Sequence, residues 1–208
     1  MKYLALDIGN VLVNQDMEPF IKAISKQMNL SIEEVNHFTN RIQRKQDLGI
    51  TSIRDELATQ FSIKSEYIVE ELIDAWHKVV QPNITSIQFL NDMVNELDID
   101  VALVSNLGFE HMAHFSSVLK DADVYKNSIH HFSCEVGARK PSLLYYKAFL
   151  DLHPKFNRCI YVDDLAENLA AGQAQGLKPF QFDLSKHAKP SDTIIKLCEL
   201  KALFTKNQ

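Results

Sequence analysis

The sequence has few cysteines and no apolar run long enough to span a membrane. Its longest apolar stretches, such as residues 99–104 and 159–162, are broken by charge well short of the roughly 20 residues that a spanning helix needs. The three cysteines are widely spaced without a C-x-x-C pair, which predicts free thiols at Cys134, Cys159 and Cys198. The N-terminal residues lack the apolar segment and cleavage site of a secretory signal. These absences predict a cytoplasmic protein that does not enter a membrane.

Positive charge is also sparse. The 22 Lys and Arg residues are outnumbered by 27 Asp and Glu residues, and no long basic run is present, so we expect no nucleic-acid partner. Of the 208 residues, 46% are hydrophobic and only six each are Gly and Pro. This composition is typical of a globular protein and excludes a linker or a disordered chain.

Residues 15–84 carry an uninterrupted helical pattern. Apolar residues at helical spacing predict four helices, which start near Met17, after Ser31, after Thr51 and after Ser65. The second has the signature of a capping box, since Glu34 follows Ser31 by three positions.

Short apolar strands alternate with helices in the rest of the chain. We expect strands at 3–6, 101–104, 159–162 and 179–182, an extended segment at 129–134, and helices at 85–97, from 108, 143–152, 167–175 and 191–203. Such alternation is typical of a parallel sheet with helices on both faces. The predicted fold class is therefore α/β, with a Rossmann-like core of residues 1–14 and 85–208 and an inserted four-helix cap of residues 15–84.

Polar side chains follow the predicted strands at the edge where open α/β sheets bind ligands. They are Asp7, Ser105-Asn106, Arg139-Lys140-Pro141 and Asp163-Asp164. Two or three carboxylates suit a hard cation such as Mg²⁺, and one of them could be a nucleophile. Hydroxyl, amide and ammonium groups would neutralise a phosphoryl group. The set predicts phosphoryl transfer.

Taken singly, these residues also have structural interpretations. Asp7 could form a turn, Ser105-Asn106 could cap the helix near Gly108, and Lys140-Pro141 could be a solvated turn. Asn168 is predicted to hold the loop at Asp164, in a structural or a functional role. His111 could face the substrate or be an ordinary residue. Trp76 and Phe38 lie on apolar helical stripes and are predicted to belong to the core of the cap.

Four motifs in order, LALDIGNVLV, VALVSNLG, GARKPS and IYVDDLAEN, make the chain resemble the haloacid dehalogenase-like hydrolase superfamily over essentially its whole length. The helical insert after the first motif is similar to the cap that closes such enzymes over small soluble substrates. The resemblance implies that Asp7 attacks phosphorus to give an aspartyl-phosphate. It also implies that Ser105 and Lys140 hold the phosphoryl oxygens, with Lys140 as a catalytic residue. Asn106, a hydrogen-bond donor next to Ser105, is predicted to bind the same phosphoryl group.

By the same resemblance, Mg²⁺ is the cofactor. Asp164 would bind it directly and Asp163 directly or through water, together with the Asp7 carboxylate and the backbone carbonyl of Gly9. Family phosphatases usually carry a second aspartate, the general acid and base, at the position of Gly9. Such a group contributes roughly 10²–10⁴ in rate. Asp16 or a residue of the cap could take its place.

The D-x-G-N-V start and the segment 48–51 resemble a subgroup related to α-D-glucose-1-phosphate phosphatases. An anomeric phosphate has a better leaving group than an alkyl ester, which fits the loss of the acid at Gly9. We therefore predict a Mg²⁺-dependent phosphatase of a small metabolite, with sugar 1-phosphates as the leading class. A non-catalytic binding protein of the same fold is the alternative that Gly9 favours. A 2-haloacid dehalogenase is less favoured, because it needs no metal and would leave Asp163-Asp164 unexplained.

Overall fold

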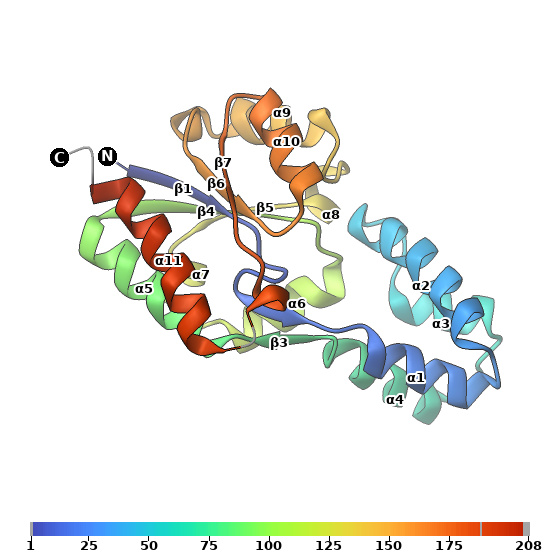
Figure 1. Ribbon diagram of the computed structural model, residues 1–208. Coiled ribbons are helices and arrows are strands. Elements are labelled where there is room, and N and C mark those ends of the chain that lie inside the picture. Colours follow the sequence, from blue (N-terminus) through green and yellow to red (C-terminus); the bar gives the residue numbers. More distant parts are fainter. Residues whose placement is uncertain (1, 188, 206–208) are drawn as a thin grey trace.

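The computed structural model describes residues 2–187 and 189–205 and has the predicted α/β architecture (Figure 1). Five parallel strands form the central sheet in the order β5-β4-β1-β6-β7. They are β1 (Lys2–Leu6), β4 (Ile99–Ser105), β5 (Ile129–Phe132), β6 (Ile160–Asp163) and β7 (Lys178–Gln181). The strand order reverses at β1, so the loops after β1, β4 and β6 meet where such sheets bind ligands.

Helices cover both faces of the sheet. On one face lie α5 (Ile84–Leu97) and α11 (Pro190–Thr205), and on the other α9 (Leu143–Leu152) and α10 (Ala166–Ala174) (Figure 1). Three further helices lie between β4 and α9 in the sequence: α6 (Phe109–Val118), α7 (Asp123–Lys126) and α8 (Ser133–Val136). In β1, Leu4 and Leu6 belong to the larger core cluster, whereas Ala5 belongs to the cluster that contains the aromatic residues of α9. Burial on both faces explains why the predicted strands are nearly continuous apolar runs.

The helical insert consists of α1 (Glu18–Met28), α2 (Ile32–Asp47), α3 (Ile53–Gln60) and α4 (Glu66–His77). Two antiparallel strands, β2 (Val13–Gln15) and β3 (Val80–Pro82), connect it to the core. The capping box is confirmed, because the Glu34 amide donates to Ser31 Oγ and the Ser31 amide donates to the Glu34 carboxylate. The division into a core of 1–14 and 85–208 and a cap of 15–84 stays our proposal.

Aromatic packing joins the cap to the core. Phe38 and Trp76 are buried, as predicted. The Trp76 ring of α4 stacks on the His111 ring of α6 with 4.7 Å between centroids, and His111 Nε2 lies 3.2 Å from the Trp76 carbonyl oxygen. Burial lowers the pKa of His111 to about 4, so this imidazole is neutral at pH 7. His111 thus contributes to cap–core packing while its edge lines the pocket described below.

The three cysteines are free thiols, as the sequence predicts. Cys134 and Cys159 are buried and Cys198 is exposed. Burial raises the pKa of the Cys134 thiol to about 11 and that of Cys159 to about 12, which makes both poor nucleophiles at neutral pH. Among the described helices, none combines the length and the apolarity that a bilayer-crossing segment requires.

Gly49 lies where the end of α2 contacts the core. Its φ is +68°, and a Cβ there would come within 2.7 Å of the Cys134 carbonyl oxygen and 2.8 Å of the Phe109 ring. We expect Gly49→Ala to lower the free energy of unfolding by about 2–4 kcal/mol, because it adds backbone strain and a clash with a backbone atom. Urea unfolding measures the difference.

Gly137 supplies the matched control. Its φ is +66°, but a Cβ there would meet nothing within 4 Å. Gly137→Ala should therefore cost only the backbone strain, about 1 kcal/mol. Equal losses in the two variants would show that the close approach to Cys134 does not constrain position 49.

Candidate active site

The predicted site residues meet at one edge of the sheet. Asp7 follows β1, Ser105 ends β4 and Asp163 ends β6, and these three strands are neighbours in parallel register. Lys140 comes from the loop between α8 and α9. The parallel sheet therefore brings together residues that lie far apart in the sequence.

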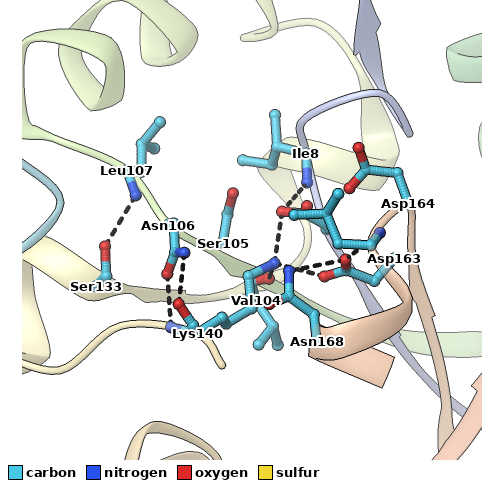
Figure 2. A network of polar contacts seen from close by, with 12 residues as sticks. Ile8, Val104, Ser105, Asn106, Leu107, Ser133, Lys140, Asp163, Asp164 and Asn168 are labelled. Atoms are coloured by element: carbon cyan, nitrogen blue, oxygen red, sulfur yellow. Dashed lines mark hydrogen bonds and ion pairs between the residues drawn. The ribbon is translucent and has the colours of Figure 1, made fainter. Parts of the chain in front are cut away.

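Lys140 is the centre of the site and only 1% exposed. Its Nζ lies 2.9 Å from Asp7 Oδ1. It also lies 2.7 Å from Asp163 Oδ2 and donates to the Val104 carbonyl oxygen at 3.0 Å (Figure 2). These three contacts use all the hydrogens of an ammonium group. Burial alone would lower the pKa of Lys140, but Asp163 and Asp7 raise it above its ordinary value. Lys140 is therefore a fixed positive charge.

Asp163 is fully buried, and both of its oxygens accept hydrogen bonds. Oδ2 contacts the Tyr161 hydroxyl and Lys140, and Oδ1 accepts from the Leu165 amide at 2.9 Å. Oδ1 also accepts from Asn168 Nδ2 at 2.9 Å (Figure 2). Burial opposes its ionisation, yet Lys140 and the hydrogen bonds hold the pKa of Asp163 below its ordinary value. With every lone pair engaged, Asp163 is placed to position Lys140 and to add its negative charge to the site.

Asp7 and Asp164 carry negative charge that the site does not balance. Burial and the Asp163 charge raise the pKa of Asp7 against the opposing effect of Lys140. Burial, together with Asp7, raises the pKa of Asp164 to about 7. Among the described residues, its side-chain hydrogen-bond partner is Asn10, whose Nδ2 donates at 3.0 Å. Removing these carboxylates from water costs free energy unless a cation compensates.

A divalent cation fits this set of carboxylates. One oxygen each of Asp7, Asp163 and Asp164 lie within 4.8 Å of one another. Hard oxygen ligands suit Mg²⁺, and its charge would lower the raised pKa values of Asp7 and Asp164. The residues present therefore match the predicted cofactor.

Gly9 borders the pocket beside Asp7. A Cβ built on Gly9 would lie 4.0 Å from Asp7 Oδ2 and 3.2 Å from Gln15 Oε1. Asp7 Oδ1 is held by the Ile8 amide at 2.7 Å and by Lys140, so Oδ2 is the oxygen that faces Gly9. A side chain at position 9 would thus stand next to the proposed nucleophilic oxygen. Its absence leaves that place without a titratable group.

Ser105 and Asn106 have different surroundings. Ser105 is buried, and its hydroxyl hydrogen-bonds to Asp7, which helps to lower the pKa of that carboxyl. Asn106 instead holds the Lys140 backbone: Oδ1 accepts from the Lys140 amide at 2.8 Å, and Nδ2 donates to its carbonyl at 3.0 Å (Figure 2). With both ends of its amide engaged, Asn106 fits a positioning role better than the predicted contact with phosphate.

Sequence reasoning missed several neighbours of the site. Tyr161 supports Asp163 from within β6, and Ser133 Oγ accepts the Leu107 amide at 2.9 Å. Side chains two positions apart in a strand point to the same face, so the position of Tyr161 in β6 could have predicted its contact with Asp163. Asp16, considered above as a substitute acid, is exposed in the hinge and accepts the Glu18 amide at 2.9 Å. It is not among the residues that line the pocket.

A pocket of about 140 Å³ opens above Asp7, between core and cap. Asp7, Lys140 and Asp164 line its floor. Its wall includes amide, carboxyl and guanidinium groups from both parts of the chain: Gln15, Gln43, Gln46, Asp47, Glu110 and Arg139. The cap therefore contributes side chains to the same cavity as the carboxylate cluster.

Comparison with known proteins finds similarity at the level of structure. No protein-family model and no curated protein matches the chain. A HAD (haloacid dehalogenase) family enzyme from Bacteroides thetaiotaomicron, in complex with magnesium and inorganic phosphate, matches with 20% identity and a TM-score of 0.70 over 91% of this chain and 98% of that one.

Two further structures are similar over most of the chain. A HAD phosphatase from Thermococcus onnurineus has 14% identity and a TM-score of 0.60, covering 91% of this chain and 88% of that one. An L-2-haloacid dehalogenase has 16% identity and a TM-score of 0.57, covering 86% and 83%. The shared feature is the fold. Because it serves both a phosphatase and a dehalogenase, the chemistry has to be argued from this chain's own side chains.

Proposed function

We propose that this protein is a Mg²⁺-dependent phosphatase that hydrolyses a small phosphorylated metabolite through an aspartyl-phosphate at Asp7. The observation that carries the proposal is the cluster of Asp7, Asp163 and Asp164, in which Lys140 pairs with Asp7 and Asp163. Three carboxylates facing one ammonium group suit a site whose remaining positive charge comes from a metal ion. A metal-independent dehalogenase would have no use for Asp164.

The proposed ligands of Mg²⁺ are Asp7, Asp164 and the Gly9 carbonyl, and Asp163, whose lone pairs are engaged, contributes its negative charge beside them. The ion, when bound, neutralises phosphoryl charge and lowers the repulsion between the phosphate and Asp7. The structures solved with magnesium and with magnesium and phosphate, both of the Bacteroides enzyme, support this choice of cofactor.

The chain's own residues supply the rest of the reaction. The Ile8 amide and Lys140 hold Asp7 Oδ1, which orients Oδ2 for attack on phosphorus. The Ser105 hydroxyl lies beside this carboxylate, where it would donate to a phosphoryl oxygen. The Lys140 ammonium, whose hydrogens are engaged, would stabilise the developing phosphoryl charge by electrostatic attraction. Asn106 fixes the backbone that carries Lys140, and Asp163 fixes its ammonium group. Such preorganisation lowers the barrier without reorganisation during the reaction.

The pocket supports a small, hydroxyl-bearing substrate. It is partly enclosed by the cap, and the amides of Gln15, Gln43 and Gln46 line it. Amide groups both donate to and accept from hydroxyls. A sugar 1-phosphate, the substrate class of the subgroup that the sequence resembles, stays the leading candidate in this proposal, as does a cytoplasmic location.

Hydrolysis of p-nitrophenyl phosphate with and without Mg²⁺ tests the function. Its leaving group needs little protonation, so the assay does not depend on an acid at position 9. We expect hydrolysis that EDTA abolishes and that added Mg²⁺ restores, together with a Mg²⁺-dependent rise in Tm. Folded protein without phosphatase activity and without a response to Mg²⁺ or phosphate would favour a binding protein instead. Release of halide from 2-chloropropionate in the presence of EDTA would favour a dehalogenase.

A further inference from the structure

A phosphatase built on this site needs a proton donor for its leaving group. Gly9 offers no side chain, and all the acceptor positions of Asp163 are engaged. Asp164 belongs to the proposed metal site. Among the described residues, the acids that remain in the pocket wall are Asp47 and Glu110.

Glu110 is committed to holding the cap on the core. Its Oε1 accepts the Ile53 amide at 2.8 Å, and its Oε2 accepts Gln46 Nε2 at 3.1 Å. Both contacts run from helix α6 of the core to the cap and lie next to the C-terminal end of α2. They fix the position of Asp47, the last residue of that helix.

Asp47 is buried, with 4% of its surface exposed, and has one oxygen left for the pocket. Arg139 binds only Oδ2 of Asp47, with Nη2 at 2.9 Å and Nε at 3.1 Å. In the described part of the chain, no side chain or amide donates to Oδ1. The Arg139 contact therefore orients the carboxyl without using it up.

We propose that Asp47 is the general acid and base of the reaction, delivered to the active site by the cap. This inference rests on the proposed phosphatase function. It assigns to a cap residue the role that position 9 of the core cannot perform. It also makes the chemistry depend on the cap being in place, because α2 carries the acid.

The electrostatic surroundings suit this role. Burial raises the pKa of Asp47 to about 6, against the opposing charges of Arg139 and Lys140 and with a contribution from Asp7. The Cys134 thiol, which Asp47 also influences, is neutral at this pH. A carboxyl that titrates near neutrality can donate a proton in one step and accept one in the next.

The two steps balance. As Asp7 Oδ2 forms its bond to phosphorus, the P–O bond to the leaving group breaks and the Asp47 proton moves to the departing oxygen, which leaves as a neutral alcohol. Asp47, now a carboxylate, takes a proton from the water that attacks the aspartyl-phosphate. The products are inorganic phosphate, a free Asp7 carboxylate and a protonated Asp47.

The test compares leaving groups in Asp47→Asn, which keeps an oxygen for Arg139. Without the acid, kcat/KM for phenyl phosphate should fall by about 10²-fold or more, while kcat/KM for p-nitrophenyl phosphate changes little. For each substrate, kcat/KM reports the steps up to and including phosphoryl transfer to Asp7. Slow hydrolysis of the aspartyl-phosphate therefore does not affect the comparison. For wild type, kcat/KM with phenyl phosphate should decline above pH 6, where Asp47 ionises, and this decline should disappear in the variant.

Glu56→Gln is the matched control. Glu56 is a second buried carboxylate of the cap, paired with Lys45 at 2.8 Å, and it does not line the pocket. It should leave the ratio of the two kcat/KM values unchanged. Equal losses on both substrates in Asp47→Asn, or a retained decline above pH 6, would overturn the assignment of Asp47 and leave the phosphatase function standing. A wild type inactive on both substrates would overturn the function and this inference with it.

Discussion

Asp7→Asn is expected to abolish hydrolysis of p-nitrophenyl phosphate without lowering the stability of the fold. The variant keeps the size of the side chain and loses the nucleophilic carboxylate. We expect the rate to fall by roughly 10⁴-fold or more, because loss of the covalent nucleophile in another enzyme costs about 10⁶-fold. A loss of about 10⁴-fold corresponds to about 5 kcal/mol of transition-state stabilisation.

Although Asp7→Asn should lower the rate, it should not lower the free energy of unfolding. Burial raises the pKa of Asp7, so its ionised form at pH 7 destabilises the folded state, and this penalty appears as pH rises through the raised pKa. Asparagine carries no charge and removes the repulsion from Asp163 and Asp164. In the absence of Mg²⁺, we therefore expect Asp7→Asn to be at least as stable as wild type at pH 7.

Two measurements check this pair of results. Steady-state assays in saturating Mg²⁺ give the rate, and thermal unfolding in EDTA gives the stability. Acid-quenched wild type incubated with substrate should yield a phosphorylated peptide that contains residue 7, and the variant should not. Substantial turnover by folded Asp7→Asn would refute the nucleophile assignment.

Lys140→Met is expected to lose both activity and stability. The substitution leaves three carboxylates together in a largely buried site with no internal cation. Breaking a buried ion pair by removing one partner costs about 3–5 kcal/mol, because the remaining charge is uncompensated. The activity should fall as well, since Lys140 orients Asp7 and is proposed to stabilise the phosphoryl charge.

The loss in stability should depend on pH. In wild type, Lys140 helps to hold the pKa of Asp163 below its ordinary value, so Asp163 adds stability above its unfolded pKa of about 3.9 that is lost as pH falls. In the variant, burial without Lys140 raises the pKa of Asp163, so its ionisation destabilises the fold as pH rises. The difference between the two proteins is therefore largest near neutrality and shrinks in acid.

Urea unfolding at pH 7 and at pH 4.5 measures this dependence. Lys147→Met is the surface control: Lys147 pairs with Asp151 at 2.5 Å, and both side chains are more than 60% exposed. Exposed pairs of this kind contribute little. Lys140→Arg, which keeps the charge, should retain part of the stability. A loss of unfolding free energy in Lys140→Met that is independent of pH would contradict the role of Lys140 as the balancing charge.

Cap and core both contribute residues to the site, so the proposed reaction depends on the contact between them. The core places Asp7, Lys140 and Asp164, whereas the proposed acid at Asp47 comes from α2 of the cap. The same end of α2 is held by Glu110 and by the close approach at Gly49. The stability of this contact region and the proposed proton transfer are therefore linked through one short segment.

Much of the architecture and of the candidate site follows from the sequence. The apolar strands and amphipathic helices are local patterns, so their order along the chain predicts a parallel sheet with an inserted helical cap. Because parallel strands end at the same edge, the positions of Asp7, Ser105 and Asp163 directly after or at the end of their strands predict that they meet. A missing side chain at Gly9 is equally visible in the sequence.

Other features were decided by the tertiary structure. Asp163 and Asp164 are adjacent and chemically identical, yet Asp163 is saturated by Lys140, Tyr161, Leu165 and Asn168, whereas Asp164 has a raised pKa. Asn106 is engaged by the Lys140 backbone rather than left free for phosphate.

The pairing of Asp47 with Arg139 joins residues 92 positions apart in the sequence. Local propensity and periodicity determine which segments form helices and strands, because those energies depend on neighbours within a few residues. Hydrogen-bond saturation, burial and charge balance depend on contacts between distant segments. Only the packed chain therefore decides which carboxylate is structural, which is left to bind a cation, and which one the cap brings to the pocket.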